Sequence, residues 1–307
     1  MQVAETPPSP SIVFGGTPLP LLPWLLGQGM DAGRPVDAET ERHALHLIDE
    51  LLARPGAPID LMPRARAVIP QLMAMLRRDD LALNALAQQV GRDLVLTAEV
   101  LRTARSAAYG GRDERLDLPQ ALGRLGVVGL NAAIARVVLR PLFETSGDGL
   151  FARTGTRLWA HSESKAQHCS ALASAGGISA FEGYLAGLMH NSGWTVALRE
   201  LDRSGLFEPR VEAAARRLST PHADVPAPAL SDTFSIALQL RCDALFGKVA
   251  ATWRITPTLT AVAESAASPG GLAASDVPLA ALLRQADVLA SSEVIGVQRA
   301  EPATVVA

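Results

Sequence analysis

Two histidines, His161 and His190, are the residues in this sequence whose type and surroundings best suit chemistry. An imidazole nitrogen can accept a hydrogen bond, transfer a proton or ligate a metal ion. His168 follows His161 by two helical turns, near the same face of a predicted helix, so the spacing also allows a three-histidine group. Helical spacing alone often produces such coincidences. The simpler interpretation is that His161 and His190 are hydrogen-bonded residues between two packed helices.

Other catalytic patterns are weak. Ser162-x-x-Lys165 has the spacing of some nucleophilic serines, but such a serine needs a lysine of depressed pKa in a pocket. The pattern lies inside a predicted helix, which favours an exposed polar turn. Gly187–His190 is no nucleophile elbow, and no glycine-rich loop lies between a strand and a helix to hold a phosphate. The two cysteines, Cys169 and Cys242, have no metal-ligand spacing, and both are predicted to be buried in a reducing compartment.

The composition predicts an all-α protein. Hydrophobic residues make up 48% of the chain and aromatic residues only 4%. Much of the apolar content is alanine and leucine, which favour helices, and alternating β-type runs are scarce. The net charge is −3, and the basic residues form only short clusters without interleaved aromatic residues. Nucleic-acid binders usually concentrate basic residues in a stripe, so we expect no nucleic-acid partner.

The start of the chain does not resemble a secretory signal. It has no positive segment, and prolines interrupt the apolar stretch 19–26. No run of about 18 apolar, uncharged, proline-free residues follows, so we expect no membrane span. The sequence therefore predicts a cytoplasmic protein.

The pattern of apolar residues, caps and breakers predicts a compact helical bundle preceded by an arm. Residues 1–37 are rich in proline and glycine, and the apolar segment 19–26 is predicted to dock on the body or on a second subunit. Asp93 is a predicted N-cap, and Asp117 with Pro119 opens a further helix. Helices are predicted for residues 39–54, about 61–76, 83–90, 94–105, 118–125, 130–143, 151–175, 181–201, 234–253 and 278–291, with loops at 106–115 and 218–230.

Five segments, in this order, resemble the HDOD domain. They run from the first half of that domain to its central helices, and they are Leu61-Met62-Pro63, Asp93, Arg105 to Gly110, Leu118 to Gly126, and the pair Leu158 to Ser162 with Ala186 to Gly193. The resemblance covers about residues 60–260. It implies an all-α, compact multi-helix bundle of HD-domain-like architecture. We therefore divide the chain into an arm with one helix (1–59), an HDOD-like domain (60–265, with halves 60–145 and 150–265) and a C-terminal helix and tail (266–307).

HDOD domains are relatives of the HD-type metal-dependent phosphohydrolases that have generally lost the metal-binding carboxylates and serve as regulatory modules in bacterial signal transduction. The resemblance places His161 and His190 at the two histidine positions of the HD site. Asn191 stands where an aspartate often follows the second histidine. Leu94 and Arg105 also depart from the pattern, but these changes affect only local turns.

The resemblance also implies a further aspartate downstream, and no acid there fits a motif. Asp232 and Asp243 are the only acids in the plausible helix. A neutral amide offers a weaker ligand than a carboxylate. We therefore expect two histidines without a carboxylate partner, no catalytic residues, no bound metal and no cofactor.

Three hypotheses for the function remain open. The first is a non-catalytic signalling module that binds a signalling protein of unknown identity through its helical surface or the groove around His161 and His190. The second is a sensor that binds a small nucleotide or anion in the degenerate cleft, to which Arg157, Lys165, Arg199, His168 and Trp194 could contribute. The third is a residual metal-dependent phosphohydrolase. The apolar arm also makes a homodimer plausible.

Overall fold

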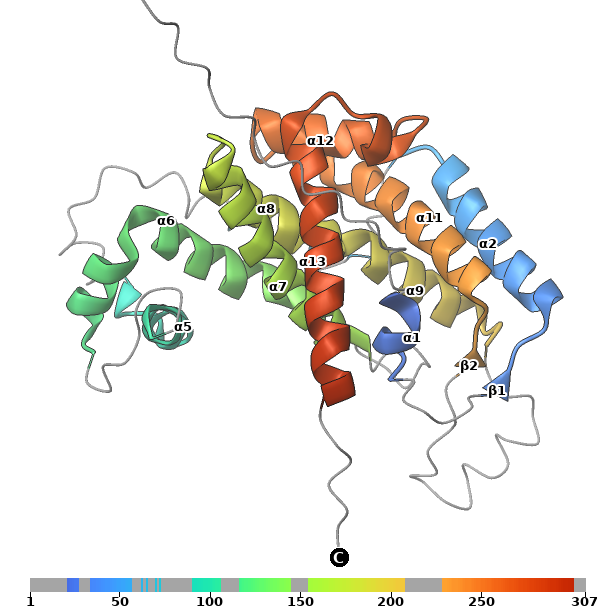
Figure 1. The fold of residues 1–307 in the computed structure, drawn as a ribbon, viewed down its shortest axis with the longest axis horizontal. Helices are drawn as coiled ribbons and strands as arrows, with labels where there is room; N and C mark the ends of the chain where they lie inside the picture. Colours follow the sequence, from blue (N-terminus) through green and yellow to red (C-terminus); the bar gives the residue numbers. More distant parts are fainter. Residues whose placement is uncertain are drawn as a thin grey trace, which may run out of the picture.

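Helices dominate the part of the chain that the structure, a computed structural model, describes (Figure 1). The described residues are 21–27, 34–56, 62, 65, 70, 72, 90–105, 116–144, 154–207 and 228–300, with side chains described as far as 295. The only sheet among them is a parallel pair of two-residue strands, β1 (Arg34–Pro35) and β2 (Pro228–Ala229). The prediction of an all-α bundle is confirmed.

The first helices begin at side-chain caps that the sequence displays. Asp37, Asp93 and Asp117 each accept a hydrogen bond from a backbone amide of the first turn that follows. Asp117 and Gln120 complete a capping box, which fixes where that helix starts. The elements of this half are the helices α1 (Leu21–Leu25), α2 (Ala38–Ala53), α5 (Leu94–Ala104) and α6 (Leu118–Leu139), and the 3-10 helix η3 (Arg140–Leu142).

Gly126 divides α6 in two. Its φ of 59° lies in the left-handed region, which glycine adopts without strain. Two separate helices, 118–125 and 130–143, were predicted here, and the first of them ends at the kink.

The second half carries the longer helices of the main body. Ser179, Ser231 and Thr256 cap three of them through backbone amides. The elements are α7 (Gly155–Ala175), α8 (Ala180–His190), α9 (Ser192–Ser204), α11 (Asp232–Ala250), α12 (Pro257–Ala267), the 3-10 helix η5 (Gly271–Ala274) and α13 (Pro278–Ala300).

Three expectations about this half were wrong. Residues 181–201 are not one helix, because the chain breaks at Asn191 between α8 and α9. Helix α12 was not predicted, although Thr256 and Pro257 form a good helix start. The last helix continues past Ser291 to Ala300. The expected helices between 61 and 90, the loop at 106–115 and most of the loop at 218–230 lie outside the described residues.

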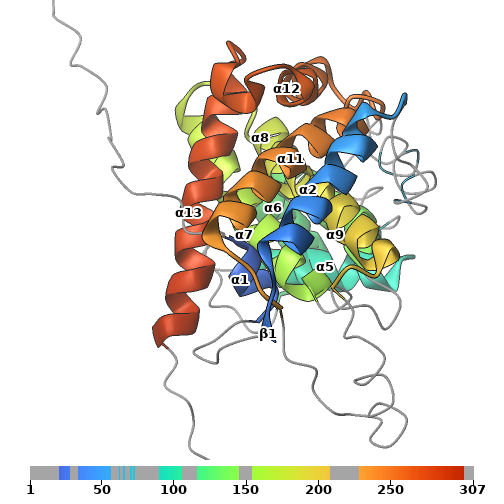
Figure 2. The same cartoon turned by 90° about the vertical axis from the view of Figure 1, so that its right-hand side faces the viewer.

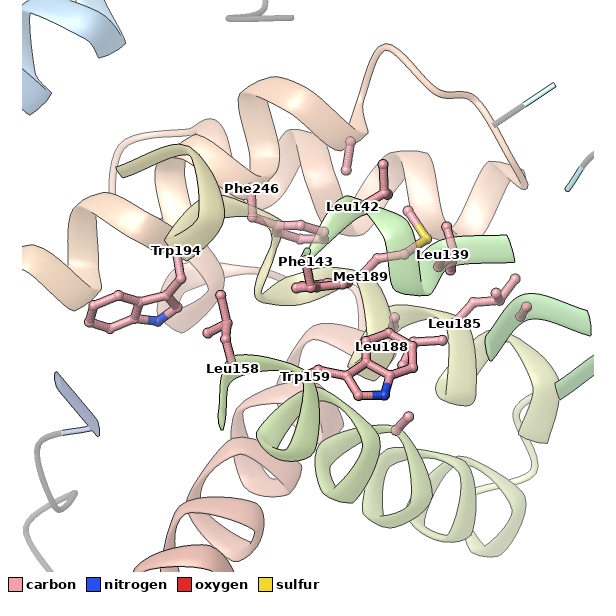
Figure 3. Packing of buried hydrophobic residues seen from close by; sticks show 14 of the residues in the cluster. Leu139, Leu142, Phe143, Leu158, Trp159, Leu185, Leu188, Met189, Trp194 and Phe246 are labelled. Carbon is pink, nitrogen blue, oxygen red and sulfur yellow. The ribbon is translucent and has the colours of Figure 1, made fainter. Parts of the chain in front are cut away.

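Close helix packing places the central elements of the body. Side chains of η3, α7, α8, α9 and α11 meet in one apolar core, where the rings of Phe143 and Trp159 lie 5.3 Å apart (Figure 3). A Cβ on Gly187 of α8 would lie 2.6 Å from the Cα of Ala166, and one on Gly193 of α9 would lie 1.9 Å from the carbonyl oxygen of Cys242. Glycine therefore lets α8 approach α7, and α9 approach α11, backbone to backbone. His190 and Asn191 lie between these two contacts.

The apolar arm docks on the body of its own chain. Helix α1 contacts α7 and α11 (Figure 2). Its residues Leu21, Leu22 and Leu25 are buried. This is one of the two arrangements that the sequence analysis allowed for the arm. The other, docking on a second subunit, stays a prediction.

One described helical segment, Leu118–Leu142, is long and apolar enough to span a membrane by length and composition alone, with a mean hydropathy of 1.6. Half of that window is buried in the protein. A core helix passes the same test, and this segment packs on α5 and α8. The segment is therefore weak evidence for a membrane span.

Candidate functional site

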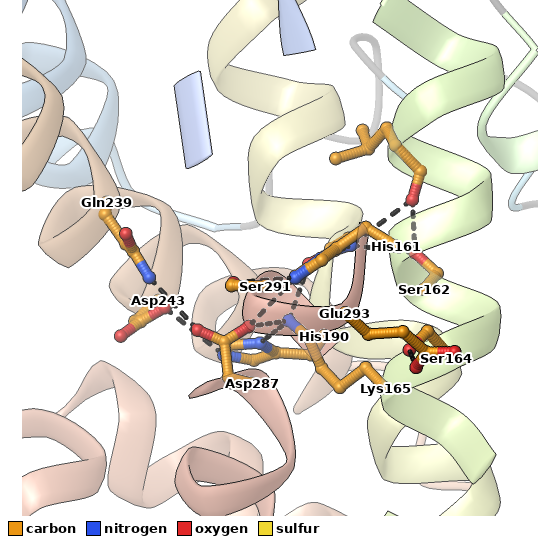
Figure 4. Close-up of polar contacts among 12 residues, drawn as sticks. His161, Ser162, Ser164, Lys165, His190, Gln239, Asp243, Asp287, Ser291 and Glu293 are labelled. Atoms are coloured by element: carbon orange, nitrogen blue, oxygen red, sulfur yellow. Dashed lines mark hydrogen bonds and ion pairs between the residues drawn. The ribbon is translucent and has the colours of Figure 1, made fainter. Parts of the chain in front are cut away.

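His161 and His190 lie close together in a buried polar cluster at the centre of the body (Figure 4). His161 comes from α7, His190 is the last residue of α8, and Asn191 is the residue between α8 and α9. Helix α13 closes the cluster on another side with Asp287 and Ser291. The first three residues were expected to lie together and do so, whereas the contribution of α13 was not expected.

Lys165 is the centre of this cluster. Its side chain is completely buried, and its Nζ lies 2.8 Å from Nδ1 of His190 and 2.7 Å from Oδ1 of Asn191. Nζ also forms an ion pair with Oδ1 of Asp287. An ammonium group has three hydrogens to donate, so these three acceptors satisfy it fully. The buried charge is therefore both hydrogen-bonded and paired, as burial of an ion requires.

The amide of Asn191 links Lys165 to the other histidine. Its Oδ1 accepts from Lys165, and its Nδ2 lies 3.0 Å from Nδ1 of His161 and donates to Oγ of Ser162 at 2.9 Å. Nδ2 also lies 3.3 Å from the carbonyl oxygen of Leu158, so its two hydrogens are shared among three acceptors. These contacts hold the side chain of Asn191 in the cluster.

His161 is a neutral imidazole. Because its Nδ1 accepts from Asn191, its hydrogen is on Nε2, which lies 3.0 Å from Oγ of Ser291. Burial, together with the positive charge of Lys165, lowers the pKa of His161 from 6.5 to about 3. The ring of Trp24, from the docked arm, lies 6.5 Å from the imidazole, centre to centre. His161 is therefore enclosed, and near neutral pH its ring carries no positive charge.

His190 faces a second acid. Its Nδ1 accepts from Lys165, which leaves the hydrogen on Nε2, 3.2 Å from Oδ1 of Asp243 but without the geometry of a hydrogen bond. The ring packs edge-on against Phe246 at 5.0 Å. Asp243 therefore lies beside His190, on the helix where a downstream acid was expected.

Asp287 is the carboxylate that the sequence analysis missed. Burial alone would raise the pKa of this carboxyl, but the adjacent charge of Lys165 keeps the pKa well below its usual range. Its Oδ2 also accepts from Nε2 of Gln239 at 3.1 Å. The expectation that the two histidines lack carboxylate partners is thus wrong, since Asp287 and Asp243 both lie beside the cluster.

The remaining candidates are dispersed. His168 lies outside the cluster and pairs with Glu293 at 2.9 Å, so the three histidines do not converge. Arg157 donates to the carbonyl of Leu25, and Arg199 donates to that of Glu144. Trp194 belongs to the apolar core (Figure 3). Arg157, Lys165 and Arg199 therefore do not converge on one place where an anion could bind. Anion binding stays a prediction.

Ser162 and Lys165 do not form an exposed polar turn, since both are buried. The hydroxyl of Ser162 donates to the carbonyl of Leu158, so it is not activated by Lys165 as a nucleophile would be.

Cys169 and Cys242 are free and buried, as predicted, and burial raises the pKa of the Cys169 thiol to about 12.

The cluster does not fit a metal ion. Among the residues that the structure describes, no three or more histidine, cysteine, aspartate or glutamate side chains form a group that could hold one. The acceptors of His190, Asn191 and Asp287 that could serve as ligands all point at the ammonium of Lys165 instead. The arrangement can hold a network of hydrogen bonds across four helices, and it has no free ligand group for a metal at its centre.

Comparison with known proteins identifies the family. The HDOD domain model matches residues 62–269 of this chain. The chain belongs to the HDOD family. A solved HDOD domain protein of unknown function from Geobacter sulfurreducens is 20% identical, with a TM-score of 0.52 and coverage of 88% of this chain and 84% of that one. A protein of Shewanella amazonensis SB2B that is named a putative metal-dependent phosphohydrolase is 18% identical, with a TM-score of 0.51 and coverage of 87% and 92%.

A curated relative, an uncharacterised protein of Treponema pallidum (strain Nichols), is 24% identical over 140 residues, which cover 45% of this chain and 26% of the relative. The HDOD chain thus matches about a quarter of the length of that protein. The two solved structures are too distant in sequence to show more than the fold. They confirm the HD-like helical architecture in which His161, His190 and Asn191 lie.

Acid should destabilise this HDOD domain through His161. Its pKa of about 3 in the folded state lies below the 6.5 of an ordinary histidine, so the unfolded chain binds the proton more readily. Neutral His161 contributes fully to the free energy of unfolding above about pH 6.5. This contribution is lost as the pH falls from 6.5 toward 3, at up to about 1.4 kcal/mol per pH unit. Urea unfolding between pH 7.5 and 5 should show this slope.

His161→Gln should flatten the slope, because the titrating imidazole is gone, whereas the exposed His46→Gln should leave it unchanged. The assignment to His161 is wrong if both variants keep the wild-type slope.

Proposed function

We propose that this HDOD domain is a regulatory module that acts by binding a partner protein, not by hydrolysis. One observation carries the proposal: Lys165 fills the centre of the HD-type site, and the residues around it are bound to one another. His161, Lys165 and Asn191 have no exposed surface, and His190 is only 5% exposed.

Hydrolysis by an HD-type site requires a metal that activates a water molecule within reach of a substrate. Asn191 supplies no negative charge, and both ends of its amide are already hydrogen-bonded. Trp24 of α1 and Ser291 of α13 lie against His161 from two other elements. These contacts favour a structural role for the cluster, so we assign function to the surface.

Exposed aliphatic side chains supply the candidate contact. Leu94 and Val95 on α5, with Val127 and Val128 on α6, are exposed, and α5 packs on α6 at one end of the molecule (Figure 1). Aliphatic groups in water favour burial against a partner, and patches of them mark interaction sites.

The test uses two double variants of the full chain. One is Val127→Asp/Val128→Asp on α6. The other is Ile236→Asp/Leu240→Asp, which changes a second pair of exposed aliphatic residues, on α11. We expect in-cell crosslinking of the wild type to yield a defined complex, and the α6 variant to lose it while keeping its helical circular dichroism. The α11 variant is the matched control and should keep the complex.

A complex that survives both substitutions would remove the support for this surface. Phosphodiester hydrolysis by the purified wild type that His161→Ala abolishes would contradict the proposal itself.

A further inference from the structure

The side chains around Lys165 have the chemistry of a cation-binding set. Nδ1 of His190, Oδ1 of Asn191 and the carboxylate of Asp287 are an imidazole nitrogen, an amide oxygen and an anionic oxygen, and all three converge on one point. Divalent metals of the first transition row accept such mixed nitrogen and oxygen ligands. In this chain the point holds the Nζ of Lys165 (Figure 4).

The hydrogen bonds of the whole cluster follow from a cation at that point. Lys165 donates to Nδ1 of His190 and to Oδ1 of Asn191, so the hydrogen of His190 is on Nε2, toward Asp243. Asn191 then donates from Nδ2 to His161, whose Nε2 faces Ser291. His190 and Asn191 therefore each present an acceptor toward Lys165 and a donor away from it, and His161 continues the same order beyond Asn191.

The charges also balance around a single positive charge. Asp287 is the only carboxylate that contacts Nζ among the described residues, and the other two acceptors are neutral. A divalent ion at the same place would leave one positive charge uncompensated in a buried site, which is costly. Lysine is also tethered to α7, so it occupies the point without the entropic cost of binding a free ion.

We propose that Lys165 is a built-in cation that takes the place of a divalent metal, linking α7, α8 and α13 and excluding metal from the site. Metal is excluded both by the volume of the side chain and by its hold on all three acceptors. The inference concerns the site alone and stands whether or not the domain acts through a partner protein.

The test measures Mn²⁺ binding to the full chain by calorimetry and by thermal unfolding. Wild type, prepared with EDTA and dialysed, should unfold at the same temperature with and without Mn²⁺. Lys165→Ala/Asn191→Asp removes the tethered cation and adds a carboxylate. It should bind Mn²⁺ at least about 10-fold more tightly than wild type, because even changes to residues behind the ligands alter metal affinity by about 10- to 100-fold. Its unfolding temperature should rise with Mn²⁺ concentration.

Asn191→Asp alone is the matched control. It carries the added carboxylate but keeps Lys165, so it should bind Mn²⁺ no better than wild type. The proposal is overturned if wild type or this control binds Mn²⁺ as tightly as the double variant, or if the folded double variant binds no more tightly than wild type.

Lys165→Ala alone provides a test that does not depend on metal. Ethylammonium chloride, which can restore an ammonium group at the vacated point, should raise its unfolding temperature more than sodium chloride of equal concentration. If a variant unfolds without additives, the same comparison is made on refolding from urea. If ethylammonium, Mn²⁺ and sodium chloride raise the unfolding temperature of Lys165→Ala, or its refolded fraction, by the same amount, the role of Lys165 is contradicted.

Discussion

Asp287→Asn is expected to destabilise the domain by about 3–5 kcal/mol, the cost of leaving the fully buried charge of Lys165 without its partner. The substitution keeps the shape of the side chain but removes the charge that balances Lys165. Lys165 cannot reach water from its place between α7, α8 and α13, since it has no exposed surface. Urea unfolding followed by circular dichroism at pH 7.5 measures the loss.

Glu293→Gln is the matched control for this prediction. Glu293 lies on the same helix and accepts hydrogen bonds from Ser164 and His168, but its carboxylate is 57% exposed. Exposed pairs contribute little, so the loss should stay below about 1 kcal/mol. Equal losses in the two variants would show that the Lys165–Asp287 pair contributes no more than a surface contact.

Gly193→Ala should be the second severe substitution, with a loss of about 3 kcal/mol or more. The new Cβ would lie 1.9 Å from the carbonyl oxygen of Cys242, and both the obstacle and Gly193 belong to helix backbones. Helices α9 and α11 must therefore separate. Because Asn191 starts α9, the variant should also disturb the amide that joins Lys165 to His161.

Gly123→Ala distinguishes this clash from a general effect of glycine. Gly123 lies in α6 and is exposed, and a Cβ added to it would meet no heavy atom within 4 Å. Alanine is the better helix former by about 1 kcal/mol, so this variant should gain stability by up to that amount. Thermal unfolding of both variants gives the comparison, and a loss in Gly123→Ala would contradict the physical reason given for Gly193.

Helices from both ends of the described chain contact the cluster around Lys165. Helix α1 buries Leu22 and Leu25 and places Trp24 near His161, while α13 supplies Asp287 to Lys165. Truncation at either end should therefore weaken the HD-type half as well as the element removed.

The sequence by itself determined the helical class, the start of several helices and the family. Side-chain caps such as Asp93 and Asp117 act within one helical turn, so helix starts can be predicted from neighbouring residues. The resemblance around His161 and His190 also predicted that these residues and Asn191 lie together. In the structure Asn191 contacts His161 and Lys165, and Lys165 contacts His190. That they form a functional site stays a prediction.

Only the tertiary structure decided what the site contains. Lys165 follows His161 by one helical turn, in a polar segment whose sequence predicts an exposed face. It is buried because α8 and α13 pack over it. Asp287 lies more than a hundred residues from Lys165, in no motif. Contacts between such distant residues depend on how whole helices pack, and no local pattern of apolar residues and caps records that packing.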